Sequence, residues 1–171
     1  MQRLAKAFLD IALWRRTPAH LPASLLLLAL TAFAAGLMEV LGALLSPGPQ
    51  DGILVRIALE VGLPPAFAWA VLAVARKRER FLQTATALLG VGILAALILY
   101  PLGAMYRALG EDRIVSIPIG IVLFAGLIWY LLACAHIWRA ALDSGLLLGG
   151  IISVGFFVLS IAFEQQLLPQ T

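Results

Sequence analysis

The chain has 171 residues, of which 63% are hydrophobic and only 12% are charged, and its mean hydropathy is +1.02. A soluble domain has roughly 45–50% apolar and about 25% charged residues, so this composition excludes a soluble globular domain and indicates one domain surrounded by lipid. The net charge of +3 comes from basic residues that flank apolar segments and line no single face, which argues against a nucleic-acid partner.

An amphipathic helix is predicted for residues 1–16. Leu4, Phe8, Ile11 and Trp14 follow helical spacing along one stripe, and the basic residues before position 7 lie away from that stripe. Basic residues opposite Phe and Trp are typical of a helix that lies in the membrane interface. The alternative is a short solvated helix that packs on the rest of the fold.

Five apolar segments follow, each long enough to cross a bilayer, which takes about 20 helical residues. They cover residues 21–45, 53–75, 81–106, 114–138 and 145–163, within a residue or two. The predicted fold class is an all-α integral membrane protein, a bundle of about five transmembrane helices preceded by the interfacial helix. A Pro- and Gly-rich turn is expected at 46–52.

The second apolar segment is the weakest of the five. Arg56, Glu60 and Pro64-Pro65 interrupt it, and prolines inside a helix kink or break it. We expect a kink or two half-helices here, and another kink at Pro101 in the third segment. The orientation of everything after the second segment depends on whether it crosses the membrane.

The distribution of basic residues predicts the orientation, because they are enriched in cytoplasmic loops. With five spans, nine basic residues fall on one side: Arg3, Lys6, Arg15, Arg16, Arg76, Lys77, Arg78, Arg80 and Arg139. Three fall on the other side: Arg56, Arg107 and Arg113. We therefore expect the N-terminus in the cytoplasm and the C-terminus outside.

A first candidate site consists of Glu39, Arg56 and Glu60. Charged groups inside a bilayer cost several kcal/mol, so they must face protein, water or each other. At 1.5 Å per residue, all three lie within roughly 5–10 Å of the turn that joins the first two segments. This set could bind a cation, move protons or hold a lipid headgroup. The alternative is a structural salt bridge that locks the two helices of this hairpin together.

A second candidate site lies at the predicted cytoplasmic edge. His136, Arg139 and Asp143 share one helix face at the end of the fourth segment. Together with the basic run Arg76, Lys77, Arg78 and Arg80, they could form a site for anionic headgroups or for a partner. The alternative is a set of side chains that reach the interface and fix the topology. A metal site is excluded, because too few ligands converge.

Small residues at Gly145, Gly149 and Ser153 recur every four positions in the last segment. Such residues let two helices approach closely, so this helix is expected to pack tightly on a neighbour. A neighbour within the same chain is favoured over a second subunit.

No enzyme motif is present, neither a nucleophile elbow, nor a zinc-protease motif, nor a phosphate-binding loop. The chain has one cysteine, Cys134, which cannot form an internal disulfide. We therefore expect a non-enzymatic protein with no cofactor and no metal.

The segments from residue 78 to 163 resemble the Yip1-type multi-pass membrane proteins. The resemblance rests on the polar entry 78–84 before a long apolar helix, on Trp129-Tyr130 ahead of the stretch 136–142, and on a last helix rich in small residues. It implies five spans, a cytoplasmic N-terminus and a non-enzymatic role in membrane organisation or trafficking.

The expected function is that of a small scaffold or accessory protein that works through membrane lipids and through other membrane proteins or copies of itself. The alternative is a small transporter or channel subunit that uses Glu39, Arg56 and Glu60. A transporter needs a polar path across the membrane, and the middles of the last three segments are almost wholly apolar, which favours the scaffold. Arg-rich, Lys-poor usage and short loops suggest a bacterial inner membrane.

Overall fold

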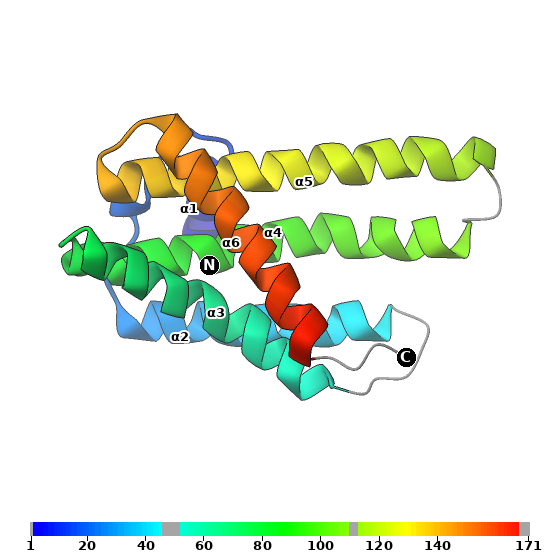
Figure 1. Cartoon of the computed structure of the whole chain (residues 1–171), viewed down its shortest axis with the longest axis horizontal. Helices are drawn as coiled ribbons and strands as arrows, with labels where there is room; N and C mark the ends of the chain where they lie inside the picture. The colour runs from blue at the N-terminus through cyan, green and yellow to red at the C-terminus, as the bar shows by residue number, and fades with distance from the viewer. Residues whose placement is uncertain (1, 46–51, 110–112, 168–171) are drawn as a thin grey trace.

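The computed structural model describes residues 2–45, 52–109 and 113–167, and within these ranges every regular element is a helix (Figure 1). The predicted turn at 46–52, apart from Gly52, and residues 110–112 of the later loop lie outside the described residues. In chain order the helices are α1 (Gln2–Ala12), the 3₁₀ helix η1 (Pro18–His20), α2 (Leu25–Leu44), α3 (Ile53–Val74), the 3₁₀ helix η2 (Arg78–Arg80), α4 (Phe81–Ala108), α5 (Arg113–Leu142) and α6 (Leu146–Leu167).

Five of these helices, α2 to α6, are long and apolar enough to cross a membrane. α2, α4 and α5 run along the long axis of the molecule, and α3 and α6 cross it obliquely (Figure 1). The connections that lead into α4 and into α6 lie at one end, which we call the basic end because Arg76, Lys77, Arg78 and Arg80 belong to it. The prediction of an all-α membrane bundle with five spans is confirmed.

The first span begins at Leu25, four residues later than the predicted start at Leu21. The chain before it forms the turn η1 and then runs extended through Leu21. Ser24 caps the helix, since its side-chain oxygen accepts a hydrogen bond from the Leu27 N–H at 3.3 Å. Serine is among the residues that most favour this position, and this cap explains the start.

Of the two outcomes expected at Pro64-Pro65, a kink or two half-helices, the second is wrong. α3 runs without interruption from Ile53 to Val74, with both prolines inside it. Pro101 likewise lies inside an unbroken α4. Membrane helices tolerate interior prolines because neighbouring helices and local adjustments satisfy the freed backbone groups. The segment that carries Arg56 and Glu60 is therefore a full-length helix.

α4 occupies the centre of the bundle and contacts α1, α2, α3 and α5. Its residues 84–91 are all buried. The two threonines of this run satisfy their own hydroxyls, because Thr84 donates to the Arg80 carbonyl at 2.9 Å and Thr86 to the Leu82 carbonyl at 2.7 Å. The first turns of α4 are thus a fully packed core close to the basic end.

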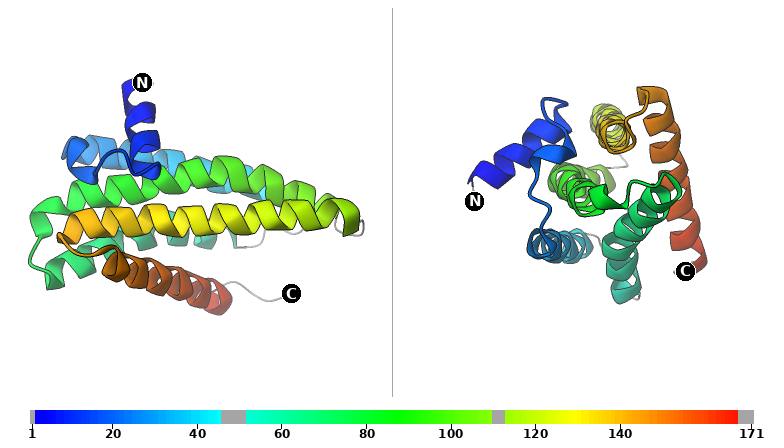
Figure 2. Two further views of the ribbon diagram at one scale, coloured as in Figure 1. Left: turned by 90° about the horizontal axis from the view of Figure 1, so that it is seen from above. Right: turned by 90° about the vertical axis from the view of Figure 1, so that its left-hand side faces the viewer.

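α1 lies across the long axis of the bundle (Figure 2). Phe8 packs against Gly90 of α4 so closely that a methyl group there would overlap the ring, and Ile11 is fully buried. Leu4 and Trp14, the ends of the predicted stripe, are 38% and 43% exposed. The middle of the stripe therefore faces the bundle, as expected for a helix packed on the fold.

The helix at the N-terminus ends at Ala12 and does not reach Arg16 as predicted. The backbone N–H groups of Arg15 and Arg16 both bond to the Asp10 carbonyl, at 2.7 and 3.2 Å, and Trp14 adopts a left-handed φ of 62°. These bonds close the helix and turn the chain. The Arg16 side chain returns to Asp10, with Nε 3.4 Å from the carboxylate.

α6 packs closely on α5 through part of its predicted small-residue stripe. A side chain at Gly149 would overlap the Ala135 carbonyl of α5, and Ser153 is buried with its hydroxyl bonded to the Gly149 carbonyl at 2.9 Å. Gly145 has open space beside it and lies just before the helix. The contact at Gly149 and Ser153 is therefore within the chain, and Gly145 takes no part in it.

Candidate functional site

The structure places Glu39, Arg56 and Glu60 in one layer of the bundle, away from the basic end. Glu39 lies five residues before the end of α2, and Arg56 and Glu60 lie three and seven residues into α3. At 1.5 Å per residue these depths are roughly 5–10 Å. All three residues line a common cavity, so the hairpin brings together the charges that the sequence singled out.

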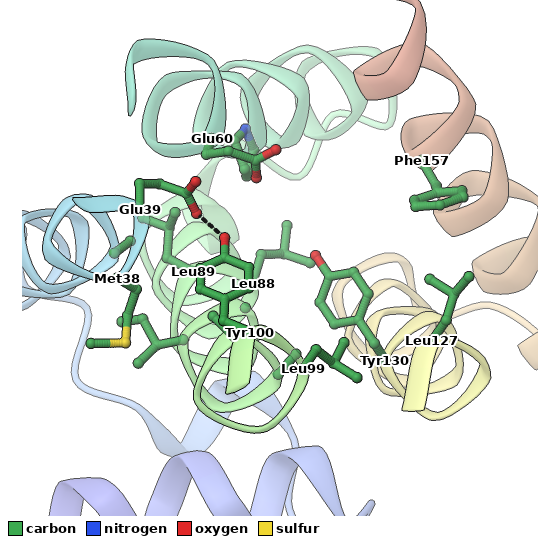
Figure 3. A pocket seen from close by; sticks show the side chains of 16 residues that line it. Met38, Glu39, Glu60, Leu88, Leu89, Leu99, Tyr100, Leu127, Tyr130 and Phe157 are labelled. Atoms are coloured by element: carbon green, nitrogen blue, oxygen red, sulfur yellow. Dashed lines mark hydrogen bonds between the residues drawn. The ribbon is translucent and has the colours of Figure 1, made fainter. Parts of the chain in front are cut away.

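Glu39 is buried and accepts a hydrogen bond from the hydroxyl of Tyr100 in α4 (Figure 3). The two residues are 61 positions apart. Tyr100 was missed by the sequence reasoning, because it lies in a long apolar segment next to Pro101 and no local spacing ties it to α2. It joins α4 to the candidate site.

Arg56 forms an ion pair with Glu164 of α6, with Nε 3.4 Å from the carboxylate oxygen. The predicted salt bridge that locks the first hairpin is wrong in its partner, because this ion pair joins α3 to α6. The last predicted segment ends at residue 163, one residue before Glu164, but α6 continues to Leu167 and carries this carboxylate into the site.

Glu60 is the most accessible carboxylate of the group. Its residue is exposed although it lies well inside the apolar helix α3, and it borders cavities on both the α2 side and the α6 side. A carboxylate exposed at this depth must face water or a ligand, because hydrocarbon would leave its charge unsolvated. Glu60 is therefore the group best placed to receive a cation.

The charged side chains surround a polar cavity of about 320 Å³. Among the described residues, three carboxylates and two guanidinium groups line it: Glu39, Glu60, Glu164, Arg56 and Arg107. With every group ionised, these five charges sum to −1. The cavity therefore favours a single positive charge, supplied by a proton or by a cation.

An apolar cavity of about 220 Å³ adjoins the polar one (Figure 3). All five spanning helices contribute to its wall, and Glu39, Glu60 and Tyr100 stand on the border between the two cavities. The remaining wall is formed mainly by apolar side chains such as Leu88, Leu127 and Phe157. A charged cavity and an apolar cavity therefore lie side by side.

A third cavity, of about 150 Å³, extends from Glu60 and Glu164 between α5 and α6. Polar side chains line it along both helices: Tyr130, Cys134, Ser153 and Ser160. The middles of the last spans were expected to be almost wholly apolar, and these four side chains are the polar groups on this face. The cavity reaches Trp138, which is 1% exposed and lies near the basic end of α5.

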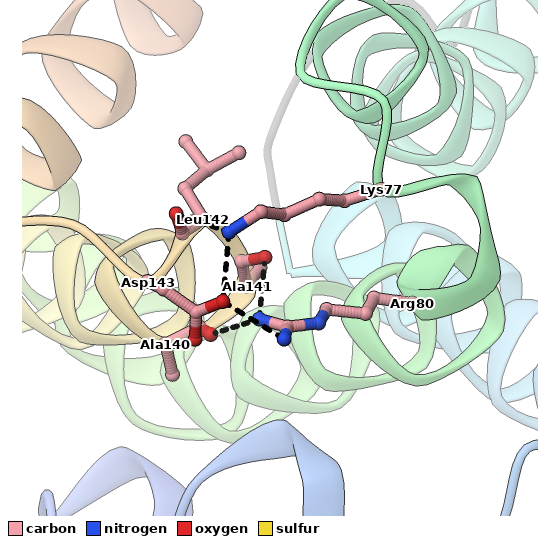
Figure 4. Close-up of polar contacts among 6 residues, drawn as sticks. All are labelled: Lys77, Arg80, Ala140, Ala141, Leu142 and Asp143. Carbon is pink, nitrogen blue, oxygen red and sulfur yellow. Dashed lines mark hydrogen bonds and ion pairs between the residues drawn. The ribbon is translucent and has the colours of Figure 1, made fainter.

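At the basic end, Lys77 and Arg80 meet Asp143 (Figure 4). The carboxylate lies 2.7 Å from Lys77 Nζ and 2.8 Å from Arg80 Nη2. Lys77 also donates to the Leu142 carbonyl at 2.6 Å, and Arg80 donates to two carbonyls of the last turn of α5. Hydrogen bonds from Arg80 and Lys77 hold the pKa of Asp143 well below its usual value. This cluster satisfies carbonyl groups at the end of α5. It also links the connection between α3 and α4 to the connection between α5 and α6.

The other residues of the predicted basic-end site lie apart from this cluster. The Arg78 guanidinium lies 5.5 Å from the ring centre of Trp69. His136 stacks on Trp14, and its Nε2 lies 3.0 Å from the Arg16 carbonyl, so it joins α5 to the N-terminal arm. Arg76, in a left-handed turn with φ 56°, and Arg139 are exposed. The expected shared face of His136 and Asp143 does not form, because α5 ends at Leu142 and Asp143 turns away with φ 49°.

Among the described residues no group of three or more His, Cys, Asp or Glu side chains is placed to hold a metal ion. Comparison with known proteins adds no assignment: no protein-family model, curated protein or solved structure matches this chain. The resemblance to Yip1-type proteins stays a prediction. The part of the chain that the structure describes is a five-span membrane bundle with a charged, cavity-lined layer.

Proposed function

We propose that this chain is a small, non-enzymatic membrane transporter subunit that takes up a proton or a monovalent cation at Glu39 and Glu60. The observation that carries the proposal is the exposed carboxylate of Glu60, which borders three cavities inside the bundle. A cavity with an excess negative charge attracts a cation, and low-dielectric walls strengthen that attraction.

The polar face between α5 and α6 supports transport over a purely structural role. Tyr130, Cys134 and Ser153 continue from Glu60 toward the basic end. Phe67 packs edge-on against Trp138 beyond them, with ring centres 5.7 Å apart. In this arrangement the carboxylate layer is open on one side and an aromatic pair closes the other. A rearrangement at Trp138 would give access from the basic end, as alternating access requires.

Flux measurements on the full chain in liposomes test the proposal. Wild-type protein with a trapped pH indicator is expected to carry a proton or cation flux that Glu39→Gln and Glu60→Gln each reduce at least tenfold. Glu79→Gln is the matched control, because Glu79 is an exposed acid at the basic end. No flux from the wild type, or equal flux from all variants, would contradict the proposal.

The scaffold function remains a second candidate, favoured by the outward face of α1. Leu9 and Leu13 are 48% and 46% exposed, and Lys6 lies on the same side of the helix. A helix across the bundle with this face suits the membrane interface, where lysine reaches the headgroups. An environment-sensitive dye at Leu9→Cys, in a Cys134→Ser background, is expected to report an apolar surrounding in vesicles. The same dye at Glu79→Cys is expected to report water, and equal emission at the two sites would contradict the interfacial position.

The membrane itself and the orientation are part of the proposal. The nine basic residues on the side of the basic end suggest that this end faces the cytoplasm of a bacterial inner membrane. The carboxylate layer would then lie toward the outside.

A further inference from the structure

The charged cavity and the apolar cavity are neighbours with two different kinds of wall. They share Glu39, Glu60, Leu99 and Tyr100. A bare inorganic cation would use the carboxylates and leave the apolar cavity without a role. The two kinds of lining therefore suit a ligand that has both a charge and an apolar part.

The apolar cavity has room for a ring-sized group. Its volume is about 220 Å³, whereas a dry protein cavity of about 150 Å³ accommodates benzene. Leu88, Leu127 and Phe157 supply apolar contacts in its wall. Gly92 also lines it, and a methyl group added at Gly92 would meet no atom within 4 Å.

The border between the cavities is suited to an organic ammonium ion. Glu39 and Glu60 bring negative charge to it, and the rings of Tyr100 and Tyr130 line the same space (Figure 3). Aromatic faces attract ammonium groups, and cages of aromatic side chains recognise quaternary ammonium ligands. The formal charge of −1 over the lining groups matches one such ion.

We propose that the ligand of this site is a monovalent organic ammonium ion with an apolar group of about the size of a ring, held with its charge beside Glu39 and Glu60 and its apolar group in the cavity at Gly92. This inference rests on the proposed function and names its substrate class. Two sources share this chemistry: a soluble amphiphilic amine, and a membrane lipid whose headgroup is an amine.

Calorimetric titration of the full chain in nanodiscs tests the ligand class without any variant. Benzyltrimethylammonium is expected to bind at least tenfold more tightly than tetramethylammonium, which lacks the ring, and than benzyl alcohol, which lacks the charge. Equal affinities for the two ammonium ions would overturn the inference. A nanodisc arm with phosphatidylethanolamine in place of phosphatidylglycerol separates the sources: weaker benzyltrimethylammonium binding there indicates a lipid ligand, and unchanged binding indicates a soluble amine.

A matched pair of glycine variants locates the ligand. Gly92→Leu fills the apolar cavity and is expected to weaken benzyltrimethylammonium binding at least tenfold. Gly62→Leu is the control, because a Cβ at Gly62 also meets no atom within 4 Å and the residue borders none of the described cavities. Equal binding by both variants would overturn the inference.

The two proposals fail separately. A flux that depends on Glu60, with no binding of benzyltrimethylammonium, would overturn the organic ligand and leave the cation function standing. Binding that Glu60→Gln and Gly92→Leu both weaken, with no flux, would overturn transport and support the binding site.

Discussion

Glu60 differs in one respect from the other charged residues of the candidate site. Glu39 accepts a hydrogen bond from the Tyr100 hydroxyl, and Arg56 and Glu164 form an ion pair with each other. Glu60 is instead exposed to the cavities. Charges inside a membrane must be satisfied by protein, water or a ligand, so the carboxylate that faces a cavity is the one available for binding.

The bond between Tyr100 and Glu39 gives a first prediction. Tyr100→Phe removes the donor and leaves a buried carboxyl group without it, so the free energy of unfolding is expected to fall by about 1–3 kcal/mol. Unfolding by SDS in mixed micelles measures this loss. Tyr106→Phe is the control, because Tyr106 is 43% exposed on the same helix. Equal losses in the two variants would show that the bond contributes nothing.

The sequence was sufficient to group Glu39, Arg56 and Glu60, because helical rise and a short turn fix their depths. It was insufficient for Tyr100 and Glu164. Both residues reach the site through packing between helices distant in sequence, which spacing along the chain cannot reveal. Glu164 was missed for a second reason: the apolar run stops at residue 163, whereas α6 continues past it to Leu167.

At the scale of the elements, the α5–α6 contact holds the side of the bundle that carries the third cavity. Gly149→Ala would push a methyl group against the Ala135 carbonyl of α5, and backbone atoms cannot move aside as a flexible side chain can. We expect a loss of about 1–3 kcal/mol in the free energy of unfolding, typical of overpacking.

Gly150→Ala is the matched control for this prediction, because a methyl group there meets no atom within 4 Å. Alanine is favoured over glycine in a helix by roughly 0.5–1 kcal/mol, so this variant is expected to be as stable as the wild type or more stable. SDS-induced unfolding compares the two, and equal stability of Gly149→Ala and Gly150→Ala would contradict the close α5–α6 approach.

The tie at the basic end gives a prediction about pH. The pKa of Asp143 in the folded protein lies below its usual value of about 3.9, so its stabilising effect is present above that value and is lost as pH falls through the lower, folded-state pKa. The difference in melting temperature between wild type and Asp143→Asn is therefore expected to stay constant from pH 8 to about 4 and to shrink below. Glu79→Gln is the control. A difference in melting temperature that already shrinks between pH 7 and 5 would contradict a stabilising contact of Asp143 with Lys77 and Arg80.

The ends of the helices are harder to predict from sequence than the positions of the apolar spans. Hydropathy marks where a helix is apolar, and it identified all five spans. Polar ends are invisible to it, so α5 continues four residues beyond the predicted end at 138 and brings Arg139 into its last turn. At Pro64-Pro65 the error is of the opposite kind, because a break was among the expected outcomes and the helix continues. Rules drawn from helices in water overstate the effect of proline in a membrane bundle.

At the scale of the whole molecule, the helices have two lengths. α2, α3 and α6 have 20 to 22 residues, or about 30–33 Å, which matches the hydrocarbon core. α4 and α5 have 28 and 30 residues, or about 42–45 Å. Their hairpin extends beyond the other helices at the end opposite to the basic end (Figure 1). The carboxylate layer lies roughly 5–10 Å from the ends of α2 and α3 that face away from the basic end.

The orientation of the molecule gives a prediction at this scale. In a Cys134→Ser background, a cysteine in place of Arg107 is expected to react with a membrane-impermeant thiol reagent added to intact cells, because three basic residues against nine place that end outside. A cysteine in place of Arg139 is expected to react only after the membrane is opened. The reverse labelling pattern would show that the chain has the opposite orientation in the membrane.

The proposed site requires that water and cations reach Glu60 inside the bundle. The most direct measurement compares Glu60→Cys with Ala58→Cys, both in a Cys134→Ser background, for reaction with a charged, membrane-impermeant thiol reagent. Ala58 is exposed on the same helix at nearly the same depth, and it lines none of the described cavities. Thiols react as thiolates, which need water. We predict that the cysteine at position 60 reacts from one side of the membrane, while the cysteine at position 58 stays unreacted. Equal reaction at the two positions, or no reaction at position 60, would contradict a water-filled path to Glu60.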